Sequence, residues 1–190
     1  MQLYSKRYVK GGDNSNVGII IRDDSEDNSP KERATVEEVY QEIWRDLEKA
    51  EELLKNKKTM NNSHFSISNV YGLKARIALV QQDYVNAVKY ASLAKVGHPL
   101  MEERIYQEGF NKYDNDEWMR GITIVDDQTD YFGNFMGYMS RNYNSTNIRQ
   151  SPKAFNSALY KKLADTDVRE KLVDPTGKHK DLDLPSNYSL

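Results

Sequence analysis

Apolar residues recur every three or four positions through residues 35–54, which predicts an amphipathic α-helix. Thr35 marks its start, because its hydroxyl can accept from the backbone N–H of Glu38 while the Glu38 carboxylate reaches back to the Thr35 N–H. This capping box sets the register of an apolar stripe about 28 Å long. The stripe comprises Val36, Val39, Tyr40, Ile43, Trp44, Leu47, Ala50 and Leu54.

Residues 68–81 and 83–96 show the same helical spacing, and we expect them to form an antiparallel hairpin across a two-residue turn. Asp83 is a favourable N-cap for the later helix, and Gly97 with Pro99 beyond it predicts its end. Small side chains on both helices would allow a close approach of the kind that builds a tetratricopeptide-type pair. They are Ala75, Ala78, Ala87, Ala91 and Ala94.

The remainder of the chain is less regular. Residues 103–107 are predicted to form a turn, residues 118–125 a short strand, and residues 153–164 a final helix with Phe155 and Leu159 on one face. The predicted fold class is therefore mainly α. Tetratricopeptide-like helical hairpins would support a loop-rich, irregular face with little β structure.

Composition narrows the function classes. A chain of 190 residues is long enough for one sizeable core, and its 13 Tyr, 5 Phe and 2 Trp make that core unusually aromatic. The formal net charge of −2 argues against a nucleic-acid surface, for which a basic stripe is expected. Cysteine is absent, which excludes disulfides, thiolate metal sites and a cysteine nucleophile.

Catalytic signatures are missing. His64, His98 and His179 lie far apart in the sequence, and none belongs to an H-E-x-x-H arrangement. Asp114-Asn-Asp116 resembles the opening of a calcium loop, but Met119 stands where such a loop needs glycine. No nucleophile elbow, phosphate loop or dinucleotide turn is found. We therefore expect neither catalytic residues nor a metal or cofactor.

One segment has the composition of a sugar-binding loop. Residues 131–144 hold five aromatic side chains, two glycines, three amides and one guanidinium. Sugar rings offer apolar C–H faces for stacking and hydroxyl rims for hydrogen bonding, so such a mixture suits them. The alternative is that these aromatics cover the helices as core, as we expect for Trp44 and Trp118. The candidate glycan contacts are Tyr131, Phe132, Tyr138, Arg141, Asn142 and Tyr143.

Three stretches in order along the chain resemble the SusD/RagB family. Residues 33–54 resemble the family run R-x-T-V-x-E-V-Y-x-x-I-x-x-D-L-x-x-A-x-x-L-L. Residues 71–91 are similar to its G-L-x-A-R…D-Y-x-x-A-x-x-Y-A segment, and residues 159–169 to its L-Y…D-T-D-x-R element. The shared order makes the resemblance more specific than any single stretch.

The resemblance implies a function without catalysis. Members of this family are outer-membrane nutrient-binding lipoproteins of the Bacteroidetes. They bind an oligosaccharide or another nutrient at the cell surface and deliver it to a SusC-type TonB-dependent transporter. The implied location is the cell-surface side of the outer membrane, through a lipid anchor on a cysteine that this sequence does not contain.

Family members are much longer, so we interpret residues 1–190 as one incomplete SusD-like domain. Residues 1–32 would be an extended segment, residues 33–97 the helices, and residues 98–190 a loop-rich ligand side. The competing interpretation is a tetratricopeptide-type protein-interaction module without a small ligand. A glycoside hydrolase, which needs two carboxylates at a defined separation, is a distant third.

Overall fold

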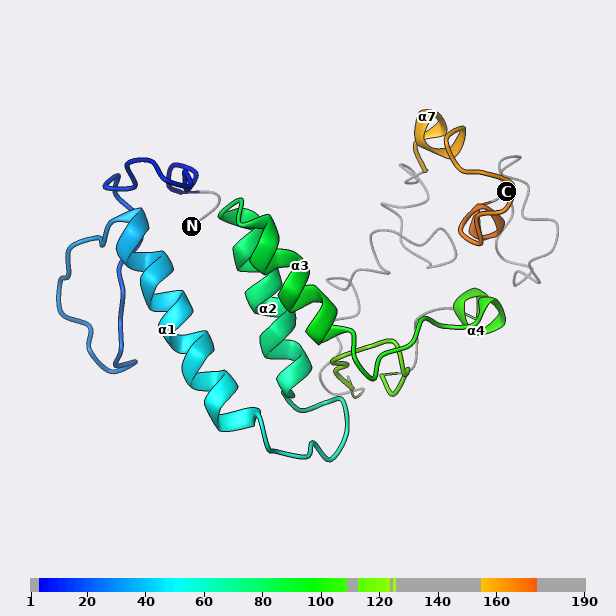
Figure 1. Ribbon diagram of the computed structural model, residues 1–190, viewed down its shortest axis with the longest axis horizontal. Coiled ribbons are helices and arrows are strands. Elements are labelled where there is room, and N and C mark those ends of the chain that lie inside the picture. Colours follow the sequence, from blue (N-terminus) through cyan, green and yellow to red (C-terminus); the bar gives the residue numbers. More distant parts are fainter. Residues whose placement is uncertain (1–3, 109–112, 124, 126–154, 174–190) are drawn as a thin grey trace. The chain divides into compact units, whose positions relative to one another are not determined.

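The computed structural model describes residues 4–108, 113–123, 125 and 155–173 (Figure 1). The chain divides into two compact units, Met1–Met101 with Lys112–Ile122 and Glu102–Asn111 with Thr123–Leu190. Helices are the only regular elements within the described residues, which confirms the mainly α prediction. The interpretation of the whole chain as a single incomplete domain stays a prediction.

The first unit contains α1 (Val36–Leu54), α2 (Ile67–Val80) and α3 (Tyr84–Ala94). Figure 1 shows α1 beside a hairpin made of α2 and α3, the pair that packs most extensively. The three helices begin and end within two residues of the predicted positions. The second unit contains α4 (Glu103–Gln107), α7 (Ser157–Tyr160) and the 3₁₀ helix η2 (Glu170–Leu172).

The predicted capping box begins α1. The Glu38 N–H donates to the Thr35 hydroxyl over 3.2 Å, and the Thr35 N–H donates to the Glu38 carboxylate over 2.7 Å. The preceding extended segment satisfies further free N–H groups of the first turn, since the carbonyls of Asn16 and Asn14 accept from Val36 and Glu37. The start of α1 is thus fixed by its own side chains and by the chain that leads into it.

The turn between α2 and α3 is a Schellman motif built without glycine. The N–H of Asp83 donates to the Ala78 carbonyl over 2.8 Å, and the N–H of Gln82 donates to the Leu79 carbonyl over 3.0 Å. Gln82 adopts a left-handed φ of +61°, and Asp83 then caps α3 by accepting from the Asn86 N–H. This tight reversal confirms the antiparallel pair.

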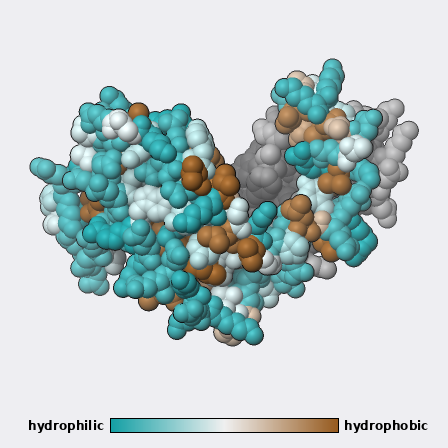
Figure 2. Space-filling model, viewed as in Figure 1, coloured by the Kyte–Doolittle hydropathy of each residue, from teal (hydrophilic) through white to brown (hydrophobic). Residues whose placement is uncertain are grey.

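The apolar core of the described residues is small and is made of residues from α1, α2 and α3. Ala78 is fully buried, in agreement with its predicted place between α2 and α3. The buried hydrophobic residues are Val36, Val39, Tyr40, Val70, Ala78 and Ala94. On the face seen in Figure 2, hydrophobic side chains gather over α2 and α3, while the surface over α1 is mostly hydrophilic.

One expectation about local structure is wrong, and another is met only in part. The described part of residues 118–125 forms no strand, because its backbone bonds to turns and to a loop: the Trp118 N–H donates to the Asn115 carbonyl and the Gly121 N–H to the Asn62 carbonyl. The helix predicted over residues 153–164 is the single turn α7, since Asn156 caps it and residues 161–163 continue as turns. Residues 153 and 154 lie outside the described residues.

The expected turn at residues 103–107 is a short helix, α4, which agrees with the prediction and is more regular. Among the described residues, no helix combines the length and the apolar character needed to cross a membrane.

Candidate binding sites

A buried cation joins α1 to the hairpin. Lys74 on α2 is only 2% exposed, and its ammonium forms an ion pair with the Glu51 carboxylate of α1. The ammonium also lies 5.3 Å from the ring centroid of Tyr90 and 6.0 Å from that of Trp44, within the range of cation–π attraction. We call this group, with Tyr71, the Lys74 cluster.

The Trp44 indole, the Tyr71 hydroxyl and the Lys74 ammonium each have a hydrogen-bond partner in the protein. The Trp44 indole N–H donates to the Gln81 side-chain oxygen over 2.6 Å, and Tyr71 stacks on the Tyr90 ring at 6.3 Å. The hydrogen bond from Lys74 lowers the pKa of Glu51 below its ordinary value, while burial raises the pKa of Tyr71. The cluster therefore joins α1 to α2 and α3.

A second group of aromatic and polar side chains lies at the end of the hairpin where α2 begins and α3 ends. Asn62 holds it together. Its side-chain amide donates to the Tyr113 backbone carbonyl over 2.5 Å, and its backbone carbonyl accepts from the Gly121 N–H over 2.9 Å. A Cβ on Gly121 would lie 2.5 Å from the Tyr113 carbonyl oxygen, so only glycine fits this close approach.

The same segment is tied to the chain that follows α3. The Met101 N–H donates to the Glu117 carboxylate over 2.9 Å, and a His98 ring nitrogen lies 3.2 Å from the Asp116 carbonyl. Residues 113–121 therefore bridge the loop before α2 and the chain after α3. Because the hairpin is antiparallel, these two loops meet at the same end of the helices.

Phe65 and Arg120 are the functional groups that this junction presents. Phe65 is 54% exposed, and the guanidinium carbon of Arg120 lies 3.9 Å from its ring centroid. Within the described residues, Arg120 forms neither an ion pair nor a hydrogen bond. We call Phe65, Arg120 and the adjoining Asn61, Asn62 and His64 the Phe65 face. Among the described residues, it offers an exposed ring and a guanidinium with no ion-pair or hydrogen-bond partner.

A groove of about 600 Å³ runs beside α1, and its charged side chains are mostly paired. Arg45 pairs with Glu42, and Arg33 donates to the Gly18 carbonyl over 2.8 Å. The groove is lined by Ile21, Lys31, Glu32, Arg33, Ala34, Glu38, Gln41, Glu42 and Arg45.

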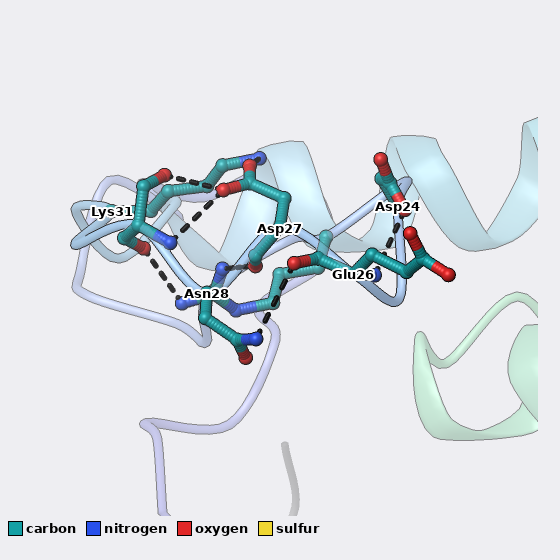
Figure 3. Close-up of polar contacts among 7 residues, drawn as sticks. Asp24, Glu26, Asp27, Asn28 and Lys31 are labelled. Carbon is teal, nitrogen blue, oxygen red and sulfur yellow. Dashed lines mark hydrogen bonds and ion pairs between the residues drawn. The ribbon is translucent and has the colours of Figure 1, made fainter.

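Figure 3 shows the loop that adjoins this groove, where Asp27 accepts from Ser29 and pairs with Lys31 at 2.7 Å. The Asn28 side chain donates to the Glu26 carbonyl over 3.3 Å. These contacts fold the loop on itself. Most charged side chains of the groove and its loop therefore already have a partner in the protein.

The second unit shows what the D-T-D-x-R element does locally. The Arg169 backbone N–H and Nε both donate to Asp167, over 3.0 and 2.9 Å, which closes a tight turn before η2. These contacts lower the pKa of Asp167 to about 2. The Tyr160 hydroxyl donates to Glu170 over 2.6 Å and ties α7 to η2. The element is thus a structural turn.

The six glycan contacts predicted from sequence lie outside the described residues, as does His179, and their roles stay predictions. Trp44 and Trp118 are both partly buried, and Trp44 packs within the Lys74 cluster. No group of three metal-ligating His, Asp or Glu side chains is found in the part of the chain that the structure describes.

Sequence reasoning missed the Phe65 face because Phe65 and Arg120 are separated in the sequence by the whole hairpin. One signal for it was present in the sequence. Three lysines precede Phe65 in the stretch between Glu52 and Asp83, which contains no Asp or Glu, so the loop carries unbalanced positive charge.

Comparisons with known proteins agree with the fold. Residues 1–79 match the SusD-like_3 family, described as "Starch-binding associating with outer membrane". A SusD-like carbohydrate binding protein from Bacteroides vulgatus ATCC 8482 is similar in structure, with a TM-score of 0.69 and 23% sequence identity. The similarity covers 88% of this chain and 36% of that protein, so the chain spans about a third of its neighbour's length. No curated protein matches the chain.

The family match begins before α1 and extends almost to the end of α2, so it includes the capping box and the Lys74–Glu51 pair. The structural similarity extends the same fold over most of the remaining chain. Residues 1–79 are therefore similar to the SusD-like_3 family, and the chain shares the fold of a SusD-like protein.

Proposed function

We propose that the protein of which this chain is part binds an oligosaccharide at the cell surface without cleaving it. The observation that carries the proposal is the match of residues 1–79 to a family described by starch binding and outer-membrane association. The structural neighbour, described as a carbohydrate binding protein, supports the same class of ligand. The absence of a recognisable catalytic motif in the sequence is consistent with binding alone.

The proposed glycan contacts are the six side chains of the aromatic segment, Tyr131, Phe132, Tyr138, Arg141, Asn142 and Tyr143. Their chemistry supports the assignment, because aromatic rings stack on sugar faces while amide and guanidinium groups donate to sugar hydroxyls. Rigid helices with functional loops are a common arrangement for such sites.

We further propose that the whole protein is lipid-anchored on the outer membrane and delivers its ligand to a SusC-type TonB-dependent transporter. The family description supports the location. The transporter contact would lie partly in regions absent from this chain. We therefore expect the 190-residue chain alone to bind a cognate transporter weakly, and nanomolar co-purification would contradict this.

A protein-interaction module is the second candidate, and α3 favours it. Apolar side chains lie exposed along this helix, and contiguous exposed apolar surface marks binding to another protein segment. They are Tyr84, Val85, Val88 and Val96, the last just beyond the end of α3.

Calorimetric titration of the full-length protein with a panel of plant, microbial and host glycans separates these candidates. Glycan binding that weakens several-fold in Tyr131→Ala and Tyr138→Ala supports the proposal, since one stacking contact is worth on the order of 1 kcal/mol. Tyr84→Ala, an exposed tyrosine on α3, is the matched control and should leave binding unchanged. Circular dichroism must show that each variant is folded.

The protein-interaction candidate would be favoured if no glycan gives a binding heat and if Val85→Asp and Val88→Asp abolish capture of a defined partner. Release of reducing ends during incubation would instead indicate a glycoside hydrolase and contradict the proposal.

A further inference from the structure

The loop that connects α1 to α2 carries positive charge without a compensating carboxylate. Lys55, Lys57 and Lys58 follow the end of α1, and the sequence has no Asp or Glu from residue 53 to residue 82. Cations near a helix C-terminus complement its dipole, but that effect fades within the last turn. Lys57 and Lys58 lie beyond α1 and its C-cap, so the dipole does not account for them.

These lysines differ from the cations of the first unit that form ion pairs. Lys10 pairs with Asp83, Lys31 with Asp27, and Lys74 with Glu51. Within the described residues, Lys57 and Lys58 form no ion pair, which is also true of Arg120. Positive charge without an ion pair among the described residues is therefore present on the same loop as Phe65 and on the segment that Asn62 binds to it, as it is at other cations such as Arg76 and Lys95.

The Phe65 face combines two recognition groups in one place. The exposed ring of Phe65 offers an apolar plane for the C–H face of a sugar. The Arg120 guanidinium, stacked 3.9 Å from the same ring, holds planar N–H groups that suit a carboxylate or sulfate in two-point contact. A sugar ring bearing an acidic substituent presents both complementary features together.

We infer that the Phe65 face is a binding site for acidic oligosaccharides, sugars that carry carboxylate or sulfate groups. The inference rests on the proposed glycan-binding function and adds the ligand class and a site apart from the aromatic segment. Asp114 and Asp116 are exposed on the same bridging segment as Arg120, so that segment is mixed in charge, which disfavours a purely electrostatic partner such as nucleic acid or an anionic membrane. The acidic oligosaccharide would stack on the Phe65 ring, and its carboxylate or sulfate would contact the Arg120 guanidinium.

The test is calorimetric titration of the 190-residue chain with three probes: oligogalacturonate, a chondroitin sulfate oligosaccharide and neutral maltoheptaose. The first two distinguish a carboxylate from a sulfate ligand. Arg120→Gln should weaken binding of the acidic probe about ten-fold, the loss expected for one charge-assisted contact. Phe65→Ala should weaken it several-fold. Arg76→Gln, which removes an exposed arginine from α2, is the control and should leave affinity unchanged.

Arg120→Lys keeps the charge but loses the planar fork, so it should bind nearly as weakly as Arg120→Gln. Full affinity in Arg120→Lys, or equal binding of duplex DNA or phosphatidylglycerol vesicles, would indicate a nonspecific basic patch and overturn the inference. Circular dichroism must match the unchanged chain. If Phe65→Ala fails to fold, Phe65→Leu replaces it, because leucine keeps apolar volume but removes the flat ring.

The outcomes separate this inference from the proposed function. Neutral-glycan binding that is lost in Tyr138→Ala, with no acidic-probe binding, would overturn the Phe65 site and leave the proposed function standing. Acidic-probe binding unaffected by Phe65→Ala and Arg120→Gln would also overturn it. Binding of no glycan by either this chain or the full-length protein would contradict both.

Discussion

The Lys74 cluster and the Phe65 face use the same kinds of groups for different purposes. In each, a cation lies against an aromatic ring, yet Lys74 is buried and paired with Glu51 while Arg120 has no ion-pair partner among the described residues. A buried charge without a partner is costly, so the buried Lys74 ammonium requires the Glu51 carboxylate to offset the cost of its desolvation. The Arg120 side chain is exposed, and no described residue pairs with its guanidinium. Pairing and burial thus distinguish a structural contact from a candidate site, whereas residue type does not.

The largest expected effect comes from leaving Lys74 unpaired. Glu51→Ala removes the only carboxylate that Lys74 contacts among the described residues, and breaking a buried pair this way costs about 3 kcal/mol in unfolding free energy. The value is at the low end for such pairs because the Glu51 side chain is 28% exposed. Urea unfolding measures it. Glu52→Ala, which removes an exposed partner of Lys49, is the control and should change stability by less than about 1 kcal/mol.

The double variant sharpens this result. Lys74→Met fills similar volume without charge, so adding it to Glu51→Ala should recover most of the lost stability. A double variant no more stable than Glu51→Ala would mean that packing of the Glu51 side chain, rather than the unpaired cation, causes the loss.

A second prediction addresses the junction that supports the Phe65 face. Gly121→Ala places a Cβ against the Tyr113 backbone. This overpacked contact should lower the unfolding free energy by about 2 kcal/mol. The loss should be local, so hydrogen exchange should accelerate in residues 113–121 while α1 stays protected. Uniform acceleration across α1, α2 and α3 would show that the junction is part of the cooperative core.

The sequence predicted the helices of the first unit well because their signals are local. Thr35 and Asp83 act as caps at the expected positions, and Ala78 is buried where the small-residue pattern placed it. The strand at residues 118–125 was predicted from alternation alone. It does not form in the described residues because the bonding partners of its backbone, such as Asn62, come from a loop far away in the sequence.

The Phe65 face could not be predicted for the same reason. Its ring and its guanidinium belong to segments separated by the hairpin, and only the close approach at Gly121 brings them together. The Lys74–Glu51 pair was missed because the stripe on α1 identified its buried face without identifying what a partner helix would place against it. The aromatic segment stays a prediction, since its residues lie outside the described ranges.

A third prediction concerns pH and the same ion pair. Lys74 lowers the pKa of Glu51 below the ordinary value of 4.5, so ionised Glu51 stabilises the folded state above that pH. This contribution is lost as the pH falls through the lowered pKa and Glu51 becomes protonated. The stability difference between the unchanged chain and Glu51→Gln should therefore be constant near pH 7 and narrow below about pH 4.5. A difference that widens on acidification would contradict the assigned pair.

The smallest expected effect on stability is that of Arg120→Gln, and it completes the comparison. Because the guanidinium lies on an exposed ring and has no ion-pair partner within the described residues, its removal forfeits only a solvated cation–π contact worth about 0.5 kcal/mol. Urea unfolding of Arg120→Gln beside Glu51→Ala measures the contrast directly. A loss comparable to that of Glu51→Ala would mean that Arg120 is a structural residue like Lys74, and the ligand role of the Phe65 face would then lose its physical basis. A near-neutral change, combined with weaker binding of the acidic probe, would show that this cation contributes to recognition and little to folding.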